Sequence, residues 1–199
     1  MVSTAAITQS AAGPEWSLPS RGRVGMGALI AAESAIFTIF VVAYLFYVGK
    51  DVSGPTPKDV LEVPVVGTIC LLSSSLTIHL AVRALRAAKI GAFGLWWFVT
   101  MALGAIFLIG TGREWHRLIF ERGLTIDTNL FGTTYYSLVG LHAFHVTAGL
   151  TGILLVMVLT LVGKVQAEHS ERVEIFSLYW HFVDVVWVIV FTVVYVIGR

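Results

Sequence analysis

The sequence carries little charge and a single cysteine. Asp, Glu, Lys and Arg make up 13% of its 199 residues, whereas 57% are apolar. A soluble domain of ordinary composition is about 25% charged, so we predict that most of this chain does not face water. The formal net charge of +1 gives no basis for a nucleic-acid partner or an acidic substrate. Cys70 alone cannot form an internal disulfide or a cysteine-based metal motif, and we interpret it as a small buried residue.

The first 24 residues lack the features of a secretory signal, which has a charged start, an apolar centre and a small-residue cleavage site. Ser, Thr, Ala, Gln and Pro dominate this segment up to Arg21 and Arg23. We therefore expect residues 1–24 to form a soluble tail and the first apolar run to act as its own insertion signal. Residues 25–199 show no second domain and no low-complexity segment.

Five long apolar runs account for most of residues 25–199. Each reaches or nearly reaches the roughly 20 residues that a helix needs to cross about 30 Å of hydrocarbon. None shows the strict alternation of a barrel strand, and backbone groups in lipid need internal hydrogen-bond partners. The sequence thus predicts an all-α polytopic membrane protein with five transmembrane helices in a bundle. The expected spans are residues 25–49, 64–86, 93–115, 133–163 and 175–198.

Prolines and polar aromatic residues mark several span ends. Pro55 and Pro57 indicate the first connecting loop, and Pro64 suits the first turn of the second helix. The fourth run is too long for one straight crossing. We therefore expect its start, residues 132–136, to lie among the lipid headgroups.

Five spans place the two termini on opposite sides of the membrane. Lysines and arginines at positions 21, 23, 83, 86, 89, 164 and 172 fall on the N-terminal side, and those at 50, 58, 113, 117, 122 and 199 on the other. This slight excess, with the compact group Arg83, Arg86 and Lys89, favours a cytoplasmic N-terminus and an outer C-terminus.

Two acids lie inside the apolar runs, Glu33 in the first and Asp184 in the fifth. A charge at the bilayer centre costs at least ~2.5–3.5 kcal/mol on insertion scales, so such residues are rarely without a role. At about 1.5 Å per residue, both acids and His145 lie roughly 12–13 Å from the inner face. A cluster of Glu33, His145 and Asp184 could therefore form if their helices are neighbours. For Glu33 the structural interpretation is a protonated carboxyl bonded to a neighbouring helix, and the functional one is an acid facing lipid or a cleft.

Histidines also occur inside the spans. His142 and His145 are three residues apart, as are His181 and Asp184, so each pair shares a helix face. His181 and Asp184 could then hydrogen-bond or form an ion pair that lowers the cost of burial. For His79 we favour a structural interpretation, with a neutral ring anchored by a backbone or hydroxyl group.

Small residues in the second and fourth spans indicate close helix packing. Helices in lipid approach one another most closely where side chains are small. On this basis we assign packing roles to Ser73, Ser74, Ser75, Gly140 and Gly149.

Four segments carry motifs specific enough to compare with a known family. They are "YWHFVDVVWVIVFTVVYVIG", "VGLHAFHVTAGL", "GALIAAESAIF" and "LLSSSLTIHLA". They resemble segments of subunit III of the haem-copper terminal oxidases. The first resembles that family's terminal helix, and the second its pair of histidines between glycines. The third resembles its first shared helix, with Glu33 at the acidic position, and the fourth its Ser-rich second shared helix. Ala32 stands where that family has Ser. The likeness covers nearly the whole chain after the tail, and five spans match the family's five-helix bacterial form.

Two further segments bear on the branch of the family. "GTGREW" departs from the family's Gln-containing version, which leaves Arg113 and Glu114 without an assigned role. "GPTPKDVLEVP" resembles the first loop of bo-type quinol oxidase subunits, whereas Glu33 in place of Asp favours the cytochrome c branch. We expect a cytochrome c oxidase in preference to a quinol oxidase.

The resemblance implies an accessory subunit of an enzyme that reduces dioxygen to water and pumps protons. The chain would hold no redox centre, no metal ligand and no catalytic residue; haem and copper would belong to the partner subunit I. Its polar cluster would be Glu33, His142, His145, His181 and Asp184. The implied partners are subunits I and II, and a phospholipid would bind in a cleft between the helices. The implied role is to support proton uptake and stability during turnover. Membership of a respiratory supercomplex is a further possibility. The implied location is a bacterial cytoplasmic membrane.

Two other functions are compatible with the polar residues. A free-standing b-type cytochrome would use two of the span histidines as haem ligands on opposite sides of one iron. His79 and His181 share a depth, so the spacing alone leaves this function open. A small proton-coupled transporter would use Glu33 and Asp184, but five spans offer no symmetric division into inverted repeats.

Overall fold

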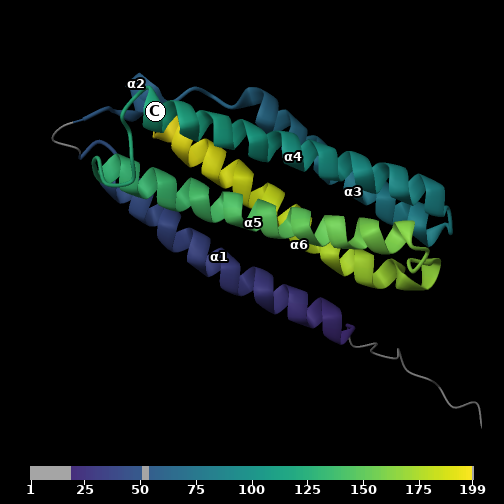
Figure 1. Ribbon diagram of the computed structural model, residues 1–199. Helices are drawn as coiled ribbons and strands as arrows, with labels where there is room; N and C mark the ends of the chain where they lie inside the picture. Colours follow the sequence, from purple (N-terminus) through teal and green to yellow (C-terminus); the bar gives the residue numbers. More distant parts are fainter. Residues whose placement is uncertain (1–18, 51–53, 199) are drawn as a thin grey trace, which may run out of the picture.

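The computed structural model describes residues 19–50 and 54–198 of the chain, which are helical over most of their length (Figure 1). No β-strand occurs in these two ranges. The expected tail, up to residue 18, and Arg199 lie outside the described residues. The helices are α1 (Arg21–Tyr47), α2 (Pro57–Val60), α3 (Val65–Arg86), α4 (Ile90–Phe120), α5 (Leu130–Leu161), the 3-10 turn η1 (Ala167–His169), α6 (Ser170–Phe191) and the π-helical segment η2 (Thr192–Ile197).

Within the described residues, five helices are long and apolar enough to cross a membrane. They are α1, α3, α4, α5 and α6 with its flanking turns, which confirms the all-α, five-span fold predicted from hydropathy. The chain is a multi-pass membrane protein.

Several helix ends differ from the apolar runs that predicted them. α1 begins at Arg21, so residues 21–24 are helical. α4 continues past the apolar run to Phe120. α5 begins at Leu130, where the Asn129 side chain accepts a hydrogen bond from the Gly132 N–H at 2.8 Å. Hydropathy reports only where side chains are apolar, whereas capping and backbone hydrogen bonds decide where a helix stops.

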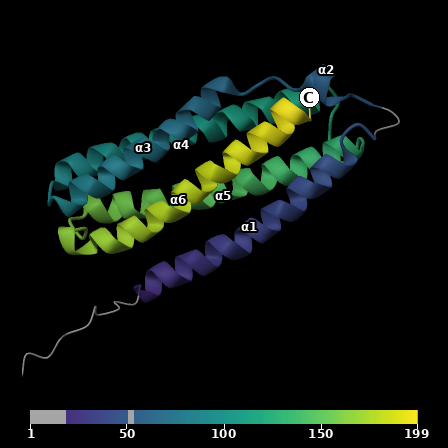
Figure 2. The same cartoon turned by 180° about the vertical axis from the view of Figure 1, so that it is seen from behind.

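The helices form an elongated bundle (Figures 1 and 2). α3 and α4 run side by side as a hairpin, α5 and α6 occupy the middle, and α1 packs against α5 and α6. The hairpin turn passes through Ala88, which has a positive φ of 55°. α1 is therefore attached to the bundle from one side, and this arrangement leaves a groove beside it.

Trp180 of α6 lies where four helices meet. Its ring is fully buried, and its Nε1 donates to Ser74 Oγ of α3 at 2.8 Å. A Cβ built on Gly104 of α4 or Gly149 of α5 would lie 2.9 Å or 2.7 Å from the Trp180 ring. These glycines allow the indole to fill the centre of the bundle.

Ion pairs tie the helices at the end of the bundle where α1 begins. Glu174 of α6 pairs with Arg23 of α1, at 3.1 Å, and with Arg86 of α3. At the opposite end, Arg117 of α4 pairs with Glu62 in the segment before α3. Each end thus has a charged link between helices that are distant in sequence.

Candidate functional site

Glu33 on α1 and His145 on α5 form a polar contact within the spanning region. Glu33 Oε2 lies 3.1 Å from His145 Nε2, and the side chains are 22% and 8% exposed. His145 Nδ1 lies 2.8 Å from the Leu141 carbonyl oxygen. Because a carbonyl only accepts hydrogen bonds, Nδ1 carries a proton, and a neutral ring then presents Nε2 as an acceptor. The pair therefore shares one further proton, held by a neutral Glu33 carboxyl or by a cationic His145 ring.

Aromatic residues enclose this contact. The Phe37 ring of α1 lies 5.0 Å from the His145 ring, centroid to centroid. The Tyr179 hydroxyl of α6 donates to the His145 carbonyl oxygen at 3.1 Å. Three helices, α1, α5 and α6, thus converge on His145, and the apolar rings shield the polar contact from lipid.

Asp184 lies in a different interface, between α6 and α3. It is 3% exposed, and Ser75 of α3 is a polar side chain within interaction range of its carboxyl. Neither carboxyl oxygen has a hydrogen bond of normal geometry to a described residue. Glu33, His145 and Asp184 therefore lie at a similar depth without forming one cluster. Glu33 and His145 meet between α1 and α5, whereas Asp184 lies between α3 and α6.

His181 does not bond to Asp184, contrary to what their spacing suggested. Its Nδ1 lies 2.6 Å from Ser75 Oγ of α3. Side chains on a helix lean toward its N-terminus, so the His181 ring leans away from Asp184, which lies about one turn later. Ser75, assigned to packing from the sequence, is the hydrogen-bond partner that holds this ring.

His142 is fully buried among aromatic rings. It stacks on Trp187 with ring centroids 5.0 Å apart and meets the edge of Phe107 at 5.7 Å. Neither ring nitrogen has a hydrogen-bond partner among the described residues. His142 thus faces α4 and α6, whereas His145, three residues later, faces α1.

His79 and Ser73 lie on the exposed surface of α3. We expected a backbone or hydroxyl anchor for His79 and a packing role for Ser73. His79 is instead exposed and within electrostatic range of His181. Both residues therefore present polar groups on the outside of a membrane-spanning helix.

The other small residues assigned to packing lie against large rings. Ser74 accepts from Trp180, and Gly149 lies against the same indole. A Cβ at Gly140 would lie 3.3 Å from the Trp115 ring.

A third acid inside the bundle, Glu114, was not identified from the sequence as a site residue. Glu114 Oε1 accepts hydrogen bonds from the hydroxyls of Tyr195, at 3.0 Å, and Tyr135, at 3.3 Å. The two hydroxyls are 3.4 Å apart, and both tyrosines are buried. Tyr195 belongs to the π-helical segment η2, a helix variant often found at functional positions. The sequence did contain a signal for this site, because Glu114, Tyr135 and Tyr195 lie at the same end of their three spans.

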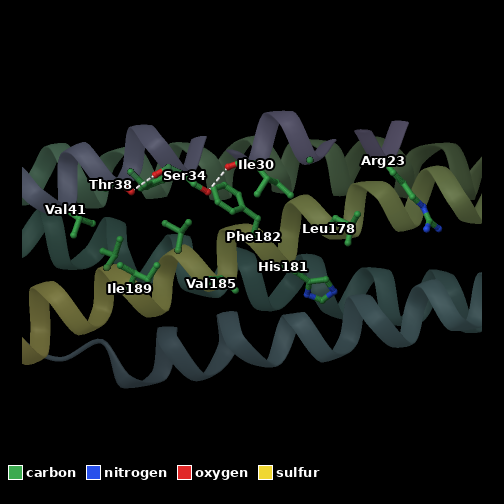
Figure 3. Close-up of a pocket in the computed structure, with 14 residues that line it drawn as sticks. Arg23, Ile30, Ser34, Thr38, Val41, Leu178, His181, Phe182, Val185 and Ile189 are labelled. Carbon is green, nitrogen blue, oxygen red and sulfur yellow. Dashed lines mark hydrogen bonds between the residues drawn. The ribbon is translucent and has the colours of Figure 1, made fainter. Parts of the chain in front are cut away.

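A groove of about 570 Å³ runs between α1 and α6 (Figure 3). Its walls are mostly apolar, with aliphatic side chains such as Ile30 and Val41 on α1 and Val185 and Ile189 on α6. Arg23 stands at one end of the row of labelled side chains. The groove has the shape and apolar lining of a site for an extended apolar ligand.

Two of the span histidines, His145 and His181, are held by contacts with other residues of the chain. Both ring nitrogens of His145 and the Nδ1 of His181 have protein partners. Among the described residues, no group of three or more His, Cys, Asp or Glu side chains could hold a metal ion.

Known proteins with similar sequences are subunits of terminal oxidases. Cytochrome c oxidase subunit 3 of Synechocystis is 40% identical over 187 residues, which cover 90% of this chain and 77% of the relative. The same subunit of Alkalihalophilus pseudofirmus is 34% identical and covers 88% and 86%. Cytochrome bo(3) ubiquinol oxidase subunit 3 of Pseudomonas aeruginosa is 35% identical and covers 87% and 84%. The relatives thus include cytochrome c and quinol oxidases.

A family model described as cytochrome c oxidase subunit III matches residues 22–199. The matched region includes all five spans and every intramembrane polar residue described above. The chain belongs to the cytochrome c oxidase subunit III family.

Proposed function

We propose that this chain is the accessory, redox-centre-free third subunit of a haem-copper terminal oxidase that reduces dioxygen to water and pumps protons. The observation that carries the proposal is the family match over residues 22–199. The arrangement of three of the span histidines supports it, because His145 bonds to Glu33, His181 bonds to Ser75 and His142 packs against aromatic rings. The chain then stabilises the complex and assists its proton supply, while haem and copper chemistry takes place in subunit I.

The exposed face of α3 is the surface we assign to subunit I. A polar residue on a spanning helix is costly against lipid and is usually found facing protein. His79 and Ser73 both lie on this face, among aliphatic side chains such as Leu76. Contact with subunit I would give these polar groups partners.

The groove between α1 and α6 is the place we propose for a phospholipid. Its aliphatic walls fit an acyl chain, and Arg23 at one end offers a cation to a phosphate. The groove is long and lies along the spanning helices, as an acyl chain does in the bilayer.

The Glu33–His145 pair is the group we assign to proton uptake. It shares one exchangeable proton at the boundary of α1 and α5, and Phe37 beside it also lines the groove. A proton can be held there without leaving a net charge in the membrane. The pair would hold this proton at the α1–α5 boundary as a supply for the complex and would not react with oxygen.

We place the protein in a bacterial cytoplasmic membrane with the start of α1 in the cytoplasm. Arg23, Arg86 and Arg172 lie at that end of the bundle, as the positive-inside rule requires. Cytochrome c is the electron donor we favour, on the basis of Glu33 at the acidic position. Subunit II and a respiratory supercomplex are further partners consistent with this role.

Affinity purification from native membranes in a mild detergent tests the proposal. We expect the tagged chain to bring down a larger membrane subunit with a Soret band and with copper, and the complex to oxidise reduced cytochrome c faster than ubiquinol. Stable isolation of the chain as a monomer, with no haem protein attached, would overturn the proposed function. Faster turnover with ubiquinol would overturn only the choice of donor.

A further inference from the structure

A second pocket, of about 360 Å³, lies at the end of the bundle opposite the start of α1. It is formed by the beginning of α3 and the last turns of α4, on the far side of the bundle from α1. Val65, Val66 and Phe107 form apolar parts of its wall. Unlike the groove beside α1, this pocket also contains charged residues of both signs, which are Glu62, Arg113, Glu114 and Arg117.

Two of the four charges are already paired with each other. Arg117 forms an ion pair with Glu62, and this link closes one side of the pocket. The remaining cation and acid are neighbours in sequence, Arg113 and Glu114. They give the pocket one guanidinium and one carboxyl for a ligand that carries both a negative and a positive group.

The carboxyl of Glu114 is held in a fixed position. Tyr195 and Tyr135 both donate to its Oε1, from the side of α5 and η2. Glu114 nevertheless lines the pocket, on the side of α3. The two tyrosines therefore orient this acid and help to stabilise its negative charge, as hydroxyl donors do for a carboxylate.

The side of the pocket near α3 favours an anion. Residues 65–67 are the first of α3 and line the pocket; the first turn contains no acidic residue, and no side chain caps it. The positive end of the α3 dipole thus adds to the charge of Arg113. The helix end alone would not define a site. Together with the Arg113 guanidinium, it gives this wall a positive charge that complements the anionic half of a ligand.

We propose that this pocket binds the headgroup of a phospholipid that carries a primary ammonium group, with Arg113 on the phosphate and Glu114 on the ammonium. A phosphoethanolamine headgroup has this pattern of charges. The acyl chains then lie along the exposed aliphatic residues of α4 beside the pocket, Ile106 and Ile109. A carboxylate accepts hydrogen bonds from a primary ammonium, whereas a trimethylated headgroup offers none.

This site is separate from the groove between α1 and α6 and does not rest on the lipid assignment made there. It predicts a lipid held at the opposite end of the bundle, and with headgroup selectivity that an aliphatic groove cannot provide. Charge complementarity distinguishes it from a general lipid-facing surface, because ordinary lipid contact requires no acid at this depth.

Photo-cross-linking of the purified oxidase complex in lipid nanodiscs tests the proposal. Photoreactive phosphatidylethanolamine, phosphatidylcholine and phosphatidylglycerol are incorporated in parallel, and labelled peptides are identified by mass spectrometry. We expect phosphatidylethanolamine to label the segments 62–67 and 110–117 in preference to the other two lipids. Arg113→Gln should reduce this labelling about tenfold, the effect of losing one charge-assisted hydrogen bond.

Two further variants make the result specific. Glu114→Gln keeps an acceptor for the tyrosines and should abolish the preference for phosphatidylethanolamine over phosphatidylglycerol. Lys58→Gln removes an exposed cation of α2 that does not line the pocket, and labelling should stay unchanged. Equal labelling by all three lipids, unchanged labelling in Arg113→Gln, or protection of the pocket by a neighbouring subunit would each overturn the proposal. The Soret band of the same samples reports association with subunit I separately, so failure of the proposed function is distinguished from failure of this site.

Discussion

At the scale of single residues, the proton shared by Glu33 and His145 decides which substitutions at position 33 are tolerated. Glutamine keeps the volume of Glu33, and its amide N–H can donate to His145 Nε2 in place of a protonated carboxyl. We therefore expect Glu33→Gln to retain the subunit in the complex. Glu33→Lys should hinder assembly, because it places a cation at this depth and Asp184 lies in another interface. Quantitative mass spectrometry of the purified complex gives the ratio of this chain to the haem subunit.

The same two variants separate structure from proton supply. If Glu33→Gln retains the subunit but slows proton uptake in reconstituted vesicles, the exchangeable proton has the role proposed here. Failure of Glu33→Gln to assemble, together with normal assembly of Glu33→Lys, would show that the shared-proton description is wrong.

Asp184 provides a contrasting case, because its carboxyl has no hydrogen bond of normal geometry to a described residue. Its 3% exposure in the α3–α6 interface predicts a packing role. Asp184→Asn keeps the shape and should be mild, whereas Asp184→Ala leaves a void and should lower the free energy of unfolding by roughly 1–3 kcal/mol. We expect the complex that retains the alanine variant to continue reducing oxygen. Oxygen-electrode turnover on complex shown to contain the subunit decides the matter, and immediate loss of activity would assign Asp184 a chemical role.

At the scale of helices, the contact between Trp180 and Gly149 gives a direct test of packing. A methyl group at position 149 would lie 2.7 Å from the indole, which itself is fixed by its bond to Ser74. We expect Gly149→Ala to destabilise the subunit by roughly 1–3 kcal/mol, the usual cost of overpacking. Differential scanning calorimetry of the complex, or the temperature at which this chain dissociates, measures the effect.

Gly94→Ala is the matched control for this substitution. A Cβ at Gly94 of α4 meets nothing within 4 Å, so alanine there should be neutral or slightly stabilising through its higher helix propensity. Equal behaviour of the two variants would contradict the role assigned to Trp180.

The short helix α2 makes a pH-dependent prediction. Asp59 accepts hydrogen bonds from the Thr56 hydroxyl, at 2.5 Å, and from the Thr56 N–H, at 3.1 Å, and these bonds lower the pKa of the Asp59 carboxyl. Because the pKa of Asp59 is lower in the folded state, the ionised carboxylate stabilises α2. This stabilisation is fully present above the ordinary pKa of Asp and is lost as the pH falls through the lowered pKa. We expect amide exchange in residues 58–61, corrected for the intrinsic pH dependence, to lose protection only in acid. Asp59→Asn should remove this pH dependence, and a persistent acid transition in that variant would point to another group.

Apolar periodicity predicted the helices well because crossing a bilayer imposes length and composition on each span. It placed the start of α3 almost correctly, since the helix begins directly after Pro64. It misplaced the end of α4, where polar residues continue the helix to Phe120, and the start of α5, which Asn129 caps. These ends depend on side-chain and backbone hydrogen bonds that hydropathy does not record.

Contacts between helices were harder to predict than the helices themselves. Depth along the membrane places Glu33 level with His145, but it places Asp184 level with them too, although it lies in another interface. Rotation about each helix axis decides which residues meet, and neighbouring helices set that rotation. The bond between His181 and Ser75 and the contact of Glu114 with Tyr195 join spans that are distant in sequence. A single sequence contains no direct record of such neighbours.

At the scale of the whole molecule, α1 is the helix with the least support. Among the described residues, its main contacts are with α5 and α6, and Phe37 and Tyr44 are its buried anchors beside the groove. The pairing of Glu33 with His145 holds its middle, and the pairing of Arg23 with Glu174 holds its beginning. The width of the groove therefore depends on a few polar contacts between α1 and the rest of the bundle.

Glu174 is the charged residue on which the beginning of α1 depends, because it contacts both Arg23 and Arg86. Glu174→Gln removes the charge, and since exposed ion pairs contribute only roughly 0.2–1 kcal/mol each, the fold should persist. We expect α1 to move more freely against α6 in this variant. Nitroxide labels at positions 25 and 178, in a chain with Cys70→Ser, report this movement in pulsed electron paramagnetic resonance. The distribution of distances between the two labels should broaden. Glu171→Gln is the control, because Glu171 lies 3.9 Å from Arg23 and should leave the distribution narrow. High salt should broaden the native distribution in the same direction, since it screens exposed charges. If the distribution is unchanged both in Glu174→Gln and in high salt, apolar packing alone holds α1, and the ion pairs do not set the width of the groove.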